Sequence, residues 1–167
     1  LTYSDWLLDF LSDRIDLGAS RAAFSDFNGT VEHEFGAKDK IRLSGYYSND
    51  EFSITSDSLY SYNNRLLSLR WNRNFNNKNN GSLIVANSEY KFNIKYDGAI
   101  DTDFKLGYKI NETELKLKMK YLHSDTHKFD YGISSKLYVV NPGTIKPIGT
   151  ESIVEASNIA KETIIIK

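Results

Sequence analysis

The chain has 167 residues, of which 40% are hydrophobic and 13% aromatic, so it is either one domain or a piece of a larger one. Its 21 basic and 22 acidic residues give a net charge of -1, which provides no electrostatic attraction to nucleic acid. The absence of cysteine excludes disulfide bonds, thiolate metal sites and cysteine nucleophiles.

Residues 1–20 lack the alternation that marks a strand. The apolar residues there instead have the spacing of one helix face, as in Trp6, Leu7, Phe10 and Leu11. We expect a short amphipathic helix inside a loop. Apolar and polar residues then alternate over residues 23–35 and again over residues 40–47, which predicts two β-strands. Between them, the sequence of residues 36–39 predicts a tight hairpin.

The middle of the chain predicts two further strands. Residues 48–60 are polar, and we expect a loop there that is longer than a hairpin needs. Alternation over residues 63–75 predicts the third strand, and residues 76–80 predict a second short turn. A fourth strand is expected from residue 82 to residue 96.

Residues 99–122 have two interpretations. Apolar residues from Phe104 to Ile110 have even numbers, whereas those from Leu115 to Tyr121 have odd numbers. Either a hairpin turns at residues 111–112, or one long strand contains a β-bulge that shifts its phase.

The last part of the chain begins with a third tight turn, expected at residues 124–127. Alternation over residues 129–139 predicts a strand that stops at residues 141–143. A long loop follows, in which we expect a helical turn over residues 151–162. Residues 163–166 are expected to begin another strand.

The expected connections differ in length between the two edges of the meander, with tight turns on one edge and long loops on the other. Outer-membrane β-barrels show this asymmetry, with short periplasmic turns and long external loops. These barrels also carry girdles of aromatic residues at the membrane interfaces. In this chain, aromatic residues near the expected strand ends would occupy such positions: Tyr46, Tyr47, Trp71, Phe75, Tyr90, Tyr96, Tyr108 and Tyr138. No run of about 18 apolar residues occurs, so a bilayer would have to be crossed by strands.

We therefore expect an all-β fold, an antiparallel up-and-down meander that forms part of a large transmembrane β-barrel. A soluble β-sandwich or an adhesin-type binding module is the alternative, because its core aromatics would produce the same alternation. A small complete barrel without transport activity is a third possibility.

Several segments resemble the barrel of TonB-dependent outer-membrane receptors, in the SusC-like branch with a carboxypeptidase-regulatory-like N-terminal domain. These segments are Tyr3-Ser4-Asp5-Trp6, Phe24-Ser25-Asp26-Phe27-Asn28, residues 43–52, Arg70-Trp71-Asn72, and residues 137–143 with Pro147. The resemblance covers nearly the whole chain. It rests on the sequence patterns of strands and on short loop motifs, and it includes no catalytic signature.

The resemblance implies a barrel of roughly 22 strands around a plug, of which residues 1–167 would supply about six to seven as an internal fragment without plug or N-terminal domains. It implies residence in the bacterial outer membrane and contact with its lipid. It also implies import of a nutrient such as a glycan, a peptide, an iron chelate or cobalamin. The TonB complex would act through the missing plug, and a surface lipoprotein is a further implied partner.

Ligand contact is expected on the loop side of the barrel, where aromatic side chains are exposed. The candidates are Trp6, Phe10, Phe52, Tyr60 and Tyr62, together with residues 141–155.

A basic row alternates with apolar residues between Leu115 and Tyr121. If Leu115, Leu117 and Met119 face lipid, the lumen-facing side chains are Lys116, Lys118 and Lys120, together with Lys105 and Lys109. The reverse assignment would cost about 2 to 4 kcal/mol for each lysine at the bilayer midplane. We expect these lysines to pair with carboxylates on neighbouring strands, such as Glu32, Glu34 and Asp130.

No catalytic or metal site is expected. His33, His123 and His127 lie near turns without acidic residues at ligand spacing. The carboxylates at residues 50–51, and those of Glu151 and Glu155, lack a nucleophile or oxyanion motif. We therefore expect no enzymatic activity, no cofactor and no nucleic-acid partner.

Overall fold

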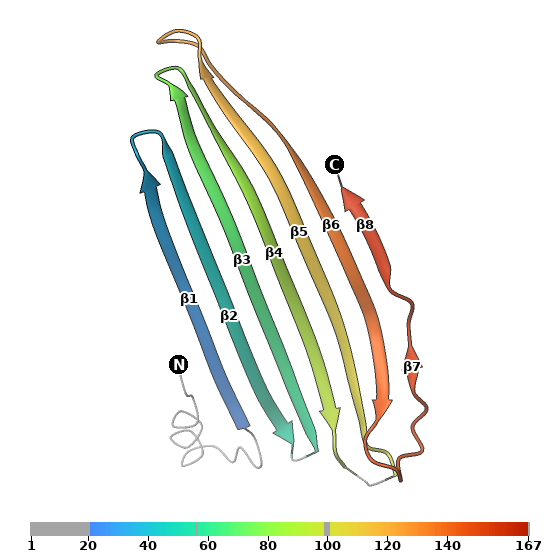
Figure 1. Ribbon diagram of the computed structural model, residues 1–167. Coiled ribbons are helices and arrows are strands. Elements are labelled where there is room, and N and C mark those ends of the chain that lie inside the picture. Colours follow the sequence, from blue (N-terminus) through green and yellow to red (C-terminus); the bar gives the residue numbers. More distant parts are fainter. Residues whose placement is uncertain (1–20, 56, 99–100, 167) are drawn as a thin grey trace.

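The computed structural model describes residues 21–55, 57–98 and 101–166 as one eight-stranded antiparallel sheet (Figure 1). The strands are β1 (Arg21–Phe35), β2 (Asp39–Thr55), β3 (Ser58–Asn76), β4 (Asn79–Tyr96), β5 (Phe104–Leu122), β6 (Lys128–Pro147), β7 (Ser157–Asn158) and β8 (Glu162–Ile166). Strands β1 to β6 pair in sequence order, and β7 and β8 both pair with the free edge of β6. The predicted all-β up-and-down meander is confirmed, and the sheet is open. The expected helix over residues 1–20 lies outside the described residues.

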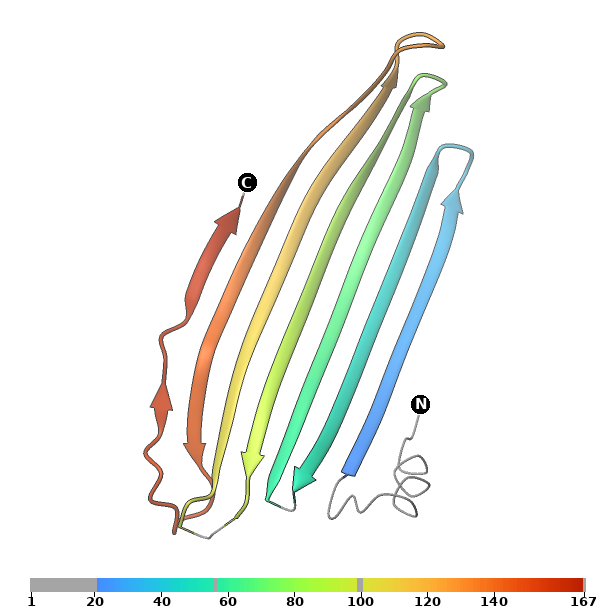
Figure 2. The ribbon, with the colours of Figure 1, turned by 180° about the vertical axis from the view of Figure 1, so that it is seen from behind.

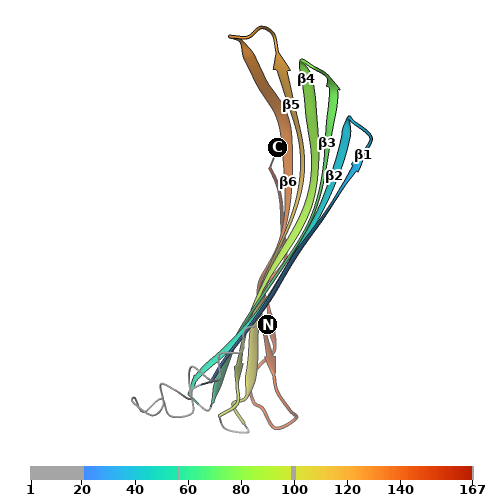
Figure 3. The ribbon, with the colours of Figure 1, turned by 90° about the vertical axis from the view of Figure 1, so that its left-hand side faces the viewer.

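The sheet is a single, strongly twisted layer. Figures 1 and 2 show the same strands from its two sides, and Figure 3 shows the twist from the edge. Among the described residues, no hydrophobic side chain is buried; apart from Gly143, the buried residues are polar or charged: Ser48, Ser53, Glu89 and Asp103. A water-soluble domain normally buries one sheet face against a second layer, so this layer lacks the core that usually stabilises a sheet.

The three predicted tight turns are confirmed and lie at one end of the sheet (Figure 1). Gly36 has φ of 69°, a left-handed conformation that glycine adopts without steric cost. In the second turn, the Asn76 side-chain oxygen accepts hydrogen bonds from the backbone nitrogens of Lys78 and Asn79, both at 2.9 Å. Asparagine side chains stabilise turns in this way, which is why the Asn-rich segment marks one.

The long loop predicted over residues 48–60 is wrong, because β2 continues to Thr55 and β3 begins at Ser58. Polar residues there bond across the strands: the Asn63 side-chain amide donates to the Ser48 carbonyl at 3.0 Å, and that of Asn64 to the Ser48 hydroxyl at 3.1 Å. A polar composition that is typical of loops is therefore compatible with paired strands.

Residues 104–122 form one strand, so the predicted alternative of a hairpin at residues 111–112 is wrong. The alternative of a bulge as the cause of the phase change is also wrong. Pairing with β4 runs without a register shift from Tyr96 opposite Phe104 to Asn79 opposite Tyr121. The apolar residues of β5 therefore move from one face of the sheet to the other.

Strand β6 does not stop at residues 141–143 as predicted but continues to Pro147. The register against β5 shifts between Gly107 and Lys109, so Pro142 and Gly143 together lie opposite Tyr108. A bulge tolerates proline, which has no N–H to donate to a ladder.

The helical turn predicted over residues 151–162 is wrong as well, since these residues are irregular or extended and include β7. The strand expected over residues 163–166 is confirmed as part of β8.

Close backbone approach at Gly132 gives a stability prediction. A Cβ there would lie 2.3 Å from the Leu117 carbonyl oxygen, whereas a Cβ at Gly45 would have its nearest contact, with a carbonyl oxygen, at 4.0 Å. We expect Gly132→Ala to lower the free energy of unfolding by about 1 to 3 kcal/mol, because backbone must shift. Gly45→Ala is the matched control and should be neutral or stabilising by about 0.5 to 1 kcal/mol. Denaturant unfolding measures both, and equal midpoints would contradict the close packing of β5 and β6.

Candidate functional site

The apolar side chains change faces halfway along the strands. We call face A the face that carries Leu83, and face B the opposite one. We call the half of the sheet that carries the three tight turns the turn half, and it ends at the row of Asn87. The other half, which ends at the connections from β2 to β3 and from β4 to β5, is the loop half. Leu83 and Val85 of β4 lie on face A in the turn half, whereas Tyr90 and Phe92 lie on face B in the loop half. The register carries this exchange across β3, β4 and β5.

Face A of the turn half is an exposed apolar band. Its side chains remain accessible although they are large, and Val31 is 71% exposed and Ile133 70%. The band comprises Val31, Phe35, Ile41, Leu43, Leu67, Leu69, Trp71, Phe75, Leu83, Val85, Leu115, Leu117, Met119, Tyr121, Phe129, Tyr131 and Ile133. Apolar surface of this extent usually meets a partner or a membrane.

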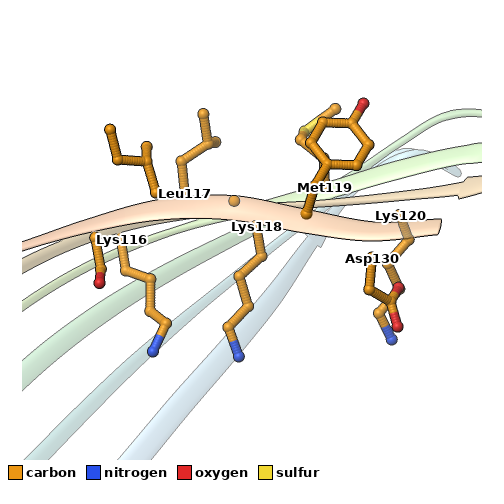
Figure 4. A pocket seen from close by; sticks show the side chains of 10 residues that line it. Lys116, Leu117, Lys118, Met119, Lys120 and Asp130 are labelled. Atoms are coloured by element: carbon orange, nitrogen blue, oxygen red, sulfur yellow. The ribbon is translucent and has the colours of Figure 1, made fainter.

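Face B of the turn half is charged. Lys116, Lys118 and Lys120 point to one side of the sheet, and Leu117 and Met119 to the other (Figure 4). Gly132 lies opposite Lys118 in the register and contributes no side chain. The three lysines thus share one face, as the alternation predicts, while their exposure to a barrel lumen stays a prediction.

Of the predicted partners of these lysines, Glu32 and Glu34 are wrong, whereas Asp130 lies directly opposite Lys120 in the register. Glu32 and Glu34 both contact Lys40, and Glu32 also accepts a hydrogen bond from Arg42 at 2.7 Å. Asp130 contacts Lys128 on its own strand at 3.9 Å.

Lys116 also contacts a carboxylate of its own strand, since its ammonium nitrogen lies 3.6 Å from Glu114 of β5. Side chains two residues apart on a strand share a face, which makes such local pairs compete with cross-strand ones.

Lys105 and Lys109 do not join the lysine row on face B. Because β5 continues without a register shift against β4, their odd numbers place them on face A with Leu115 and Leu117. The prediction that all five lysines share one face is wrong for these two.

Face B of the loop half carries an aromatic cluster, which consists of Phe52, Tyr60, Tyr62, Tyr90, Phe92 and Tyr108. Phe52 stacks on Tyr60 with ring centroids 4.9 Å apart. Tyr62 contacts Phe92 at 4.8 Å, and Phe92 contacts Tyr108 at 5.2 Å. All six side chains are half-buried, and they come from four neighbouring strands, β2, β3, β4 and β5.

Three of the predicted ligand-binding residues, Phe52, Tyr60 and Tyr62, belong to this cluster. They lie in strands β2 and β3, so the expectation that they belong to loops is wrong. Trp6 and Phe10 lie outside the described residues. Sequence reasoning missed the other three members, although their shared even numbering on neighbouring strands was a usable signal. Flat apolar rings with hydroxyl edges suit ligands that present both apolar and polar groups.

The three histidines lie at or near tight turns, as predicted. The ring of His33 contacts that of Phe35 at 4.4 Å, and the His127 backbone nitrogen donates to the Ser124 carbonyl at 3.3 Å. Within residues 21–55, 57–98 and 101–166, no three His, Asp or Glu side chains are grouped to hold a metal ion. The same part of the chain has no helix of the length and apolarity needed to cross a bilayer.

The connection between β4 and β5 brings two carboxylates, those of Asp97 and Asp103, close to each other. Burial raises the pKa of Asp103, and the nearby Asp97 carboxylate raises it further. Lys95 holds the pKa of Asp97 below its usual range. The Asp103 carbonyl also accepts hydrogen bonds from the Ile148 nitrogen at 3.0 Å and the Ser152 hydroxyl at 2.7 Å. These bonds tie the connection to the segment that follows β6.

The aromatic cluster should couple energetically. In a double-mutant cycle of Tyr62→Leu and Phe92→Leu, we expect a coupling of about 0.5 to 1.5 kcal/mol, because the two rings are in contact. Phe27→Leu and Tyr131→Leu, on β1 and β6, form the control cycle and should be additive. Denaturant unfolding provides the four free energies in each cycle. Additivity of Tyr62 and Phe92 would show that their contact does not stabilise the sheet.

The contribution of Asp103 to the free energy of unfolding should decrease as pH rises. Its raised pKa means that the folded state holds the proton more tightly than the unfolded state, whose usual pKa is 3.8. The stabilisation is present below that value and is lost as pH rises through the folded pKa. Asp103→Asn cannot ionise, so its stability relative to the wild type should increase between pH 3 and pH 7. Chemical unfolding over this range measures the difference, and a pH-independent difference would contradict the assignment.

Comparisons with known proteins leave the assignment at the level of fold class. No family model matches the sequence, and neither a curated protein nor a solved structure matches it. The chain is an all-antiparallel β-meander with many exposed hydrophobic side chains.

Proposed function

We propose that this sheet is part of the wall of a transmembrane β-barrel in the bacterial outer membrane, a segment of a TonB-dependent receptor that imports a nutrient. One observation carries the proposal: the exposed apolar band on face A is backed by charged side chains on face B, which come from the alternate residues of the same strands. A barrel wall needs this combination, because lipid covers its outer face while its inner face meets water.

The size of the apolar band fits a bilayer. In β4 the turn half runs from Asn79 to Asn87, roughly 26 Å at about 3.3 Å per residue. Membrane strands use about 9 to 11 residues, tilted relative to the membrane normal. Aromatic side chains at the turn end of the band, such as Tyr121 and Phe129, occupy the place of an interfacial girdle.

The exchange of faces favours a barrel over the alternative of a soluble sandwich. A sandwich buries the same face of a sheet along its whole length. A tall barrel wall leaves the bilayer partway along its strands, and its outer face then becomes polar. Face A does this in the loop half, where Glu89, Lys91 and Asn93 replace Leu83 and Val85.

The aromatic cluster would then face the lumen on the external side of the membrane. This position supports contact with an incoming nutrient, a glycan, a peptide, an iron chelate or cobalamin. Transport itself would depend on a plug and the TonB complex, and capture on a surface lipoprotein. Within this chain, the contribution is wall and binding surface.

Spin labels test which face meets lipid. The chain contains no cysteine, so single substitutions to Cys introduce unique labelling sites. For the chain in lipid vesicles, we expect labels at Val85 and Leu117 to collide with oxygen and to be shielded from a polar nickel chelate. Labels at the adjacent Ile84 and Lys116 should show the reverse, since they occupy face B.

A label at Lys91 is the control for the exchange of faces, because it lies on face A beyond the band and should be accessible to the nickel chelate. Equal accessibility at Val85 and Ile84 would overturn the lipid-facing assignment. So would cooperative folding of the chain as a monomer without detergent, which would instead favour a soluble module.

A further inference from the structure

A glycine on face A of the loop half is surrounded by polar side chains. Gly107 of β5 lies opposite Asn93 of β4 and Thr144 of β6 in the register. Residues that pair across strands share a face, and so do residues two apart along a strand. The positions around Gly107 on face A are therefore Lys91, Asn93, Lys95, Lys105, Lys109, Asn141, Thr144 and Lys146.

A hollow of about 350 Å³ lies over Gly107, and all of these residues except Lys95 line it. We call it the Gly107 hollow. Gly107 keeps it open, because a Cβ at this position would lie 2.6 Å from the Asn93 side-chain oxygen. The bulge in β6 spreads one side of it, since Asn141 and Thr144 lie three residues apart on the same face. A volume of this size is in the range of small-molecule sites, roughly 300 to 1,000 Å³.

One side of the hollow carries positive charge that the sheet does not neutralise. Lys105 lies directly opposite both Lys95 and Lys146, and like charges in such pairs destabilise a sheet. Lys95 contacts Asp97, whereas Lys105 and Lys146 have no ion-pair partner within the described part of the chain. Two neighbouring ammonium groups are therefore open to an external anion.

The other side of the hollow is also short of carboxylates. Glu89, whose side chain is 4% exposed, lies 3.0 Å from Lys91, 3.4 Å from Lys109 and 3.1 Å from Arg65. One carboxylate is thus shared among three cations. The hollow as a whole keeps an excess of positive charge, which is largest beside Lys105 and Lys146.

The donors around the hollow match a phosphate group. A phosphate monoester carries about -1.5 to -2 charges at pH 7 and three acceptor oxygens, whereas a carboxylate carries a single charge. Lys105 and Lys146 provide the two positive charges, and the Asn93 side-chain amide provides further N–H donors. We propose that the Gly107 hollow binds the phosphate group of a small soluble molecule between Lys105 and Lys146.

This site is separate from the binding surface proposed on face B, because the aromatic cluster lies on the opposite side of the sheet. It depends on the strand register and not on the proposed barrel wall. In the polar half of face A, water reaches the hollow whether or not lipid covers the apolar band.

Isothermal titration calorimetry of the full chain in a neutral detergent tests the proposal, with inorganic phosphate, glucose 6-phosphate and acetate as probes. We expect saturable binding of both phosphates at one site, and binding of acetate that is weaker by about tenfold or more. Lys105→Gln/Lys146→Gln should weaken phosphate binding by about tenfold or more, because it removes both unpaired charges. Gly107→Ala should weaken it as well, although it removes no charge, because the added methyl group fills part of the hollow.

The matched control is Lys118→Gln/Lys120→Gln, which removes two lysines from face B and should bind phosphate as the wild type does. Loss of binding in this control, or unchanged binding in the Lys105/Lys146 variant, would mean that bulk charge attracts phosphate and would overturn the site. Absence of saturable binding, equal binding of acetate, or unchanged binding in Gly107→Ala would overturn it too.

The two phosphate probes identify the source of the phosphate group. Tighter binding of glucose 6-phosphate assigns the hollow to a phosphorylated organic molecule, whereas equal or tighter binding of inorganic phosphate assigns it to the free anion.

Discussion

The continuous antiparallel ladder is the constraint on which the rest of this molecule depends. Between β4 and β5 it holds one register from Asn79 to Tyr96, so every side chain is assigned to a row and a face by backbone pairing alone. A packed core usually contributes to this assignment, but none lies within the described residues. Because a shift of one residue would exchange the two faces, the sheet's chemistry depends directly on this register.

A single layer without a core has little reason to be stable in water. Burial of apolar surface is the main favourable term in folding, and here the large apolar side chains of face A remain exposed. Cross-strand ring stacking and ion pairs supply local stabilisation on face B, but such pairs contribute only modestly each. In the proposed barrel wall, lipid on face A would supply the missing term, and the environment of the sheet would then be part of its fold.

Periodicity predicted the strand type and the tight turns, because alternation and Asn-rich turns are local signals. It failed at residues 48–60, where polar side chains bond across strands, and at Pro142, where a bulge absorbs a residue that usually ends a strand. Both cases depend on a neighbouring strand that the local pattern does not contain. The aromatic cluster was predicted in part for the same reason: its members come from four strands, and only the register brings them together.

The phase change in β5 explains why one local pattern had two meanings. Alternation of apolar and polar residues was interpreted as one apolar face, and a change of parity therefore required a bulge or a turn. The unbroken register with β4 shows that the parity of the apolar residues changes here without a bulge or a turn. A strand that passes from lipid to water has this property, since its outer face must be apolar in one half and can be polar in the other. The same change leaves Leu115 and Lys109 on one face, so the apolar side chains of one half and the charged side chains of the other follow from a single feature of the sequence.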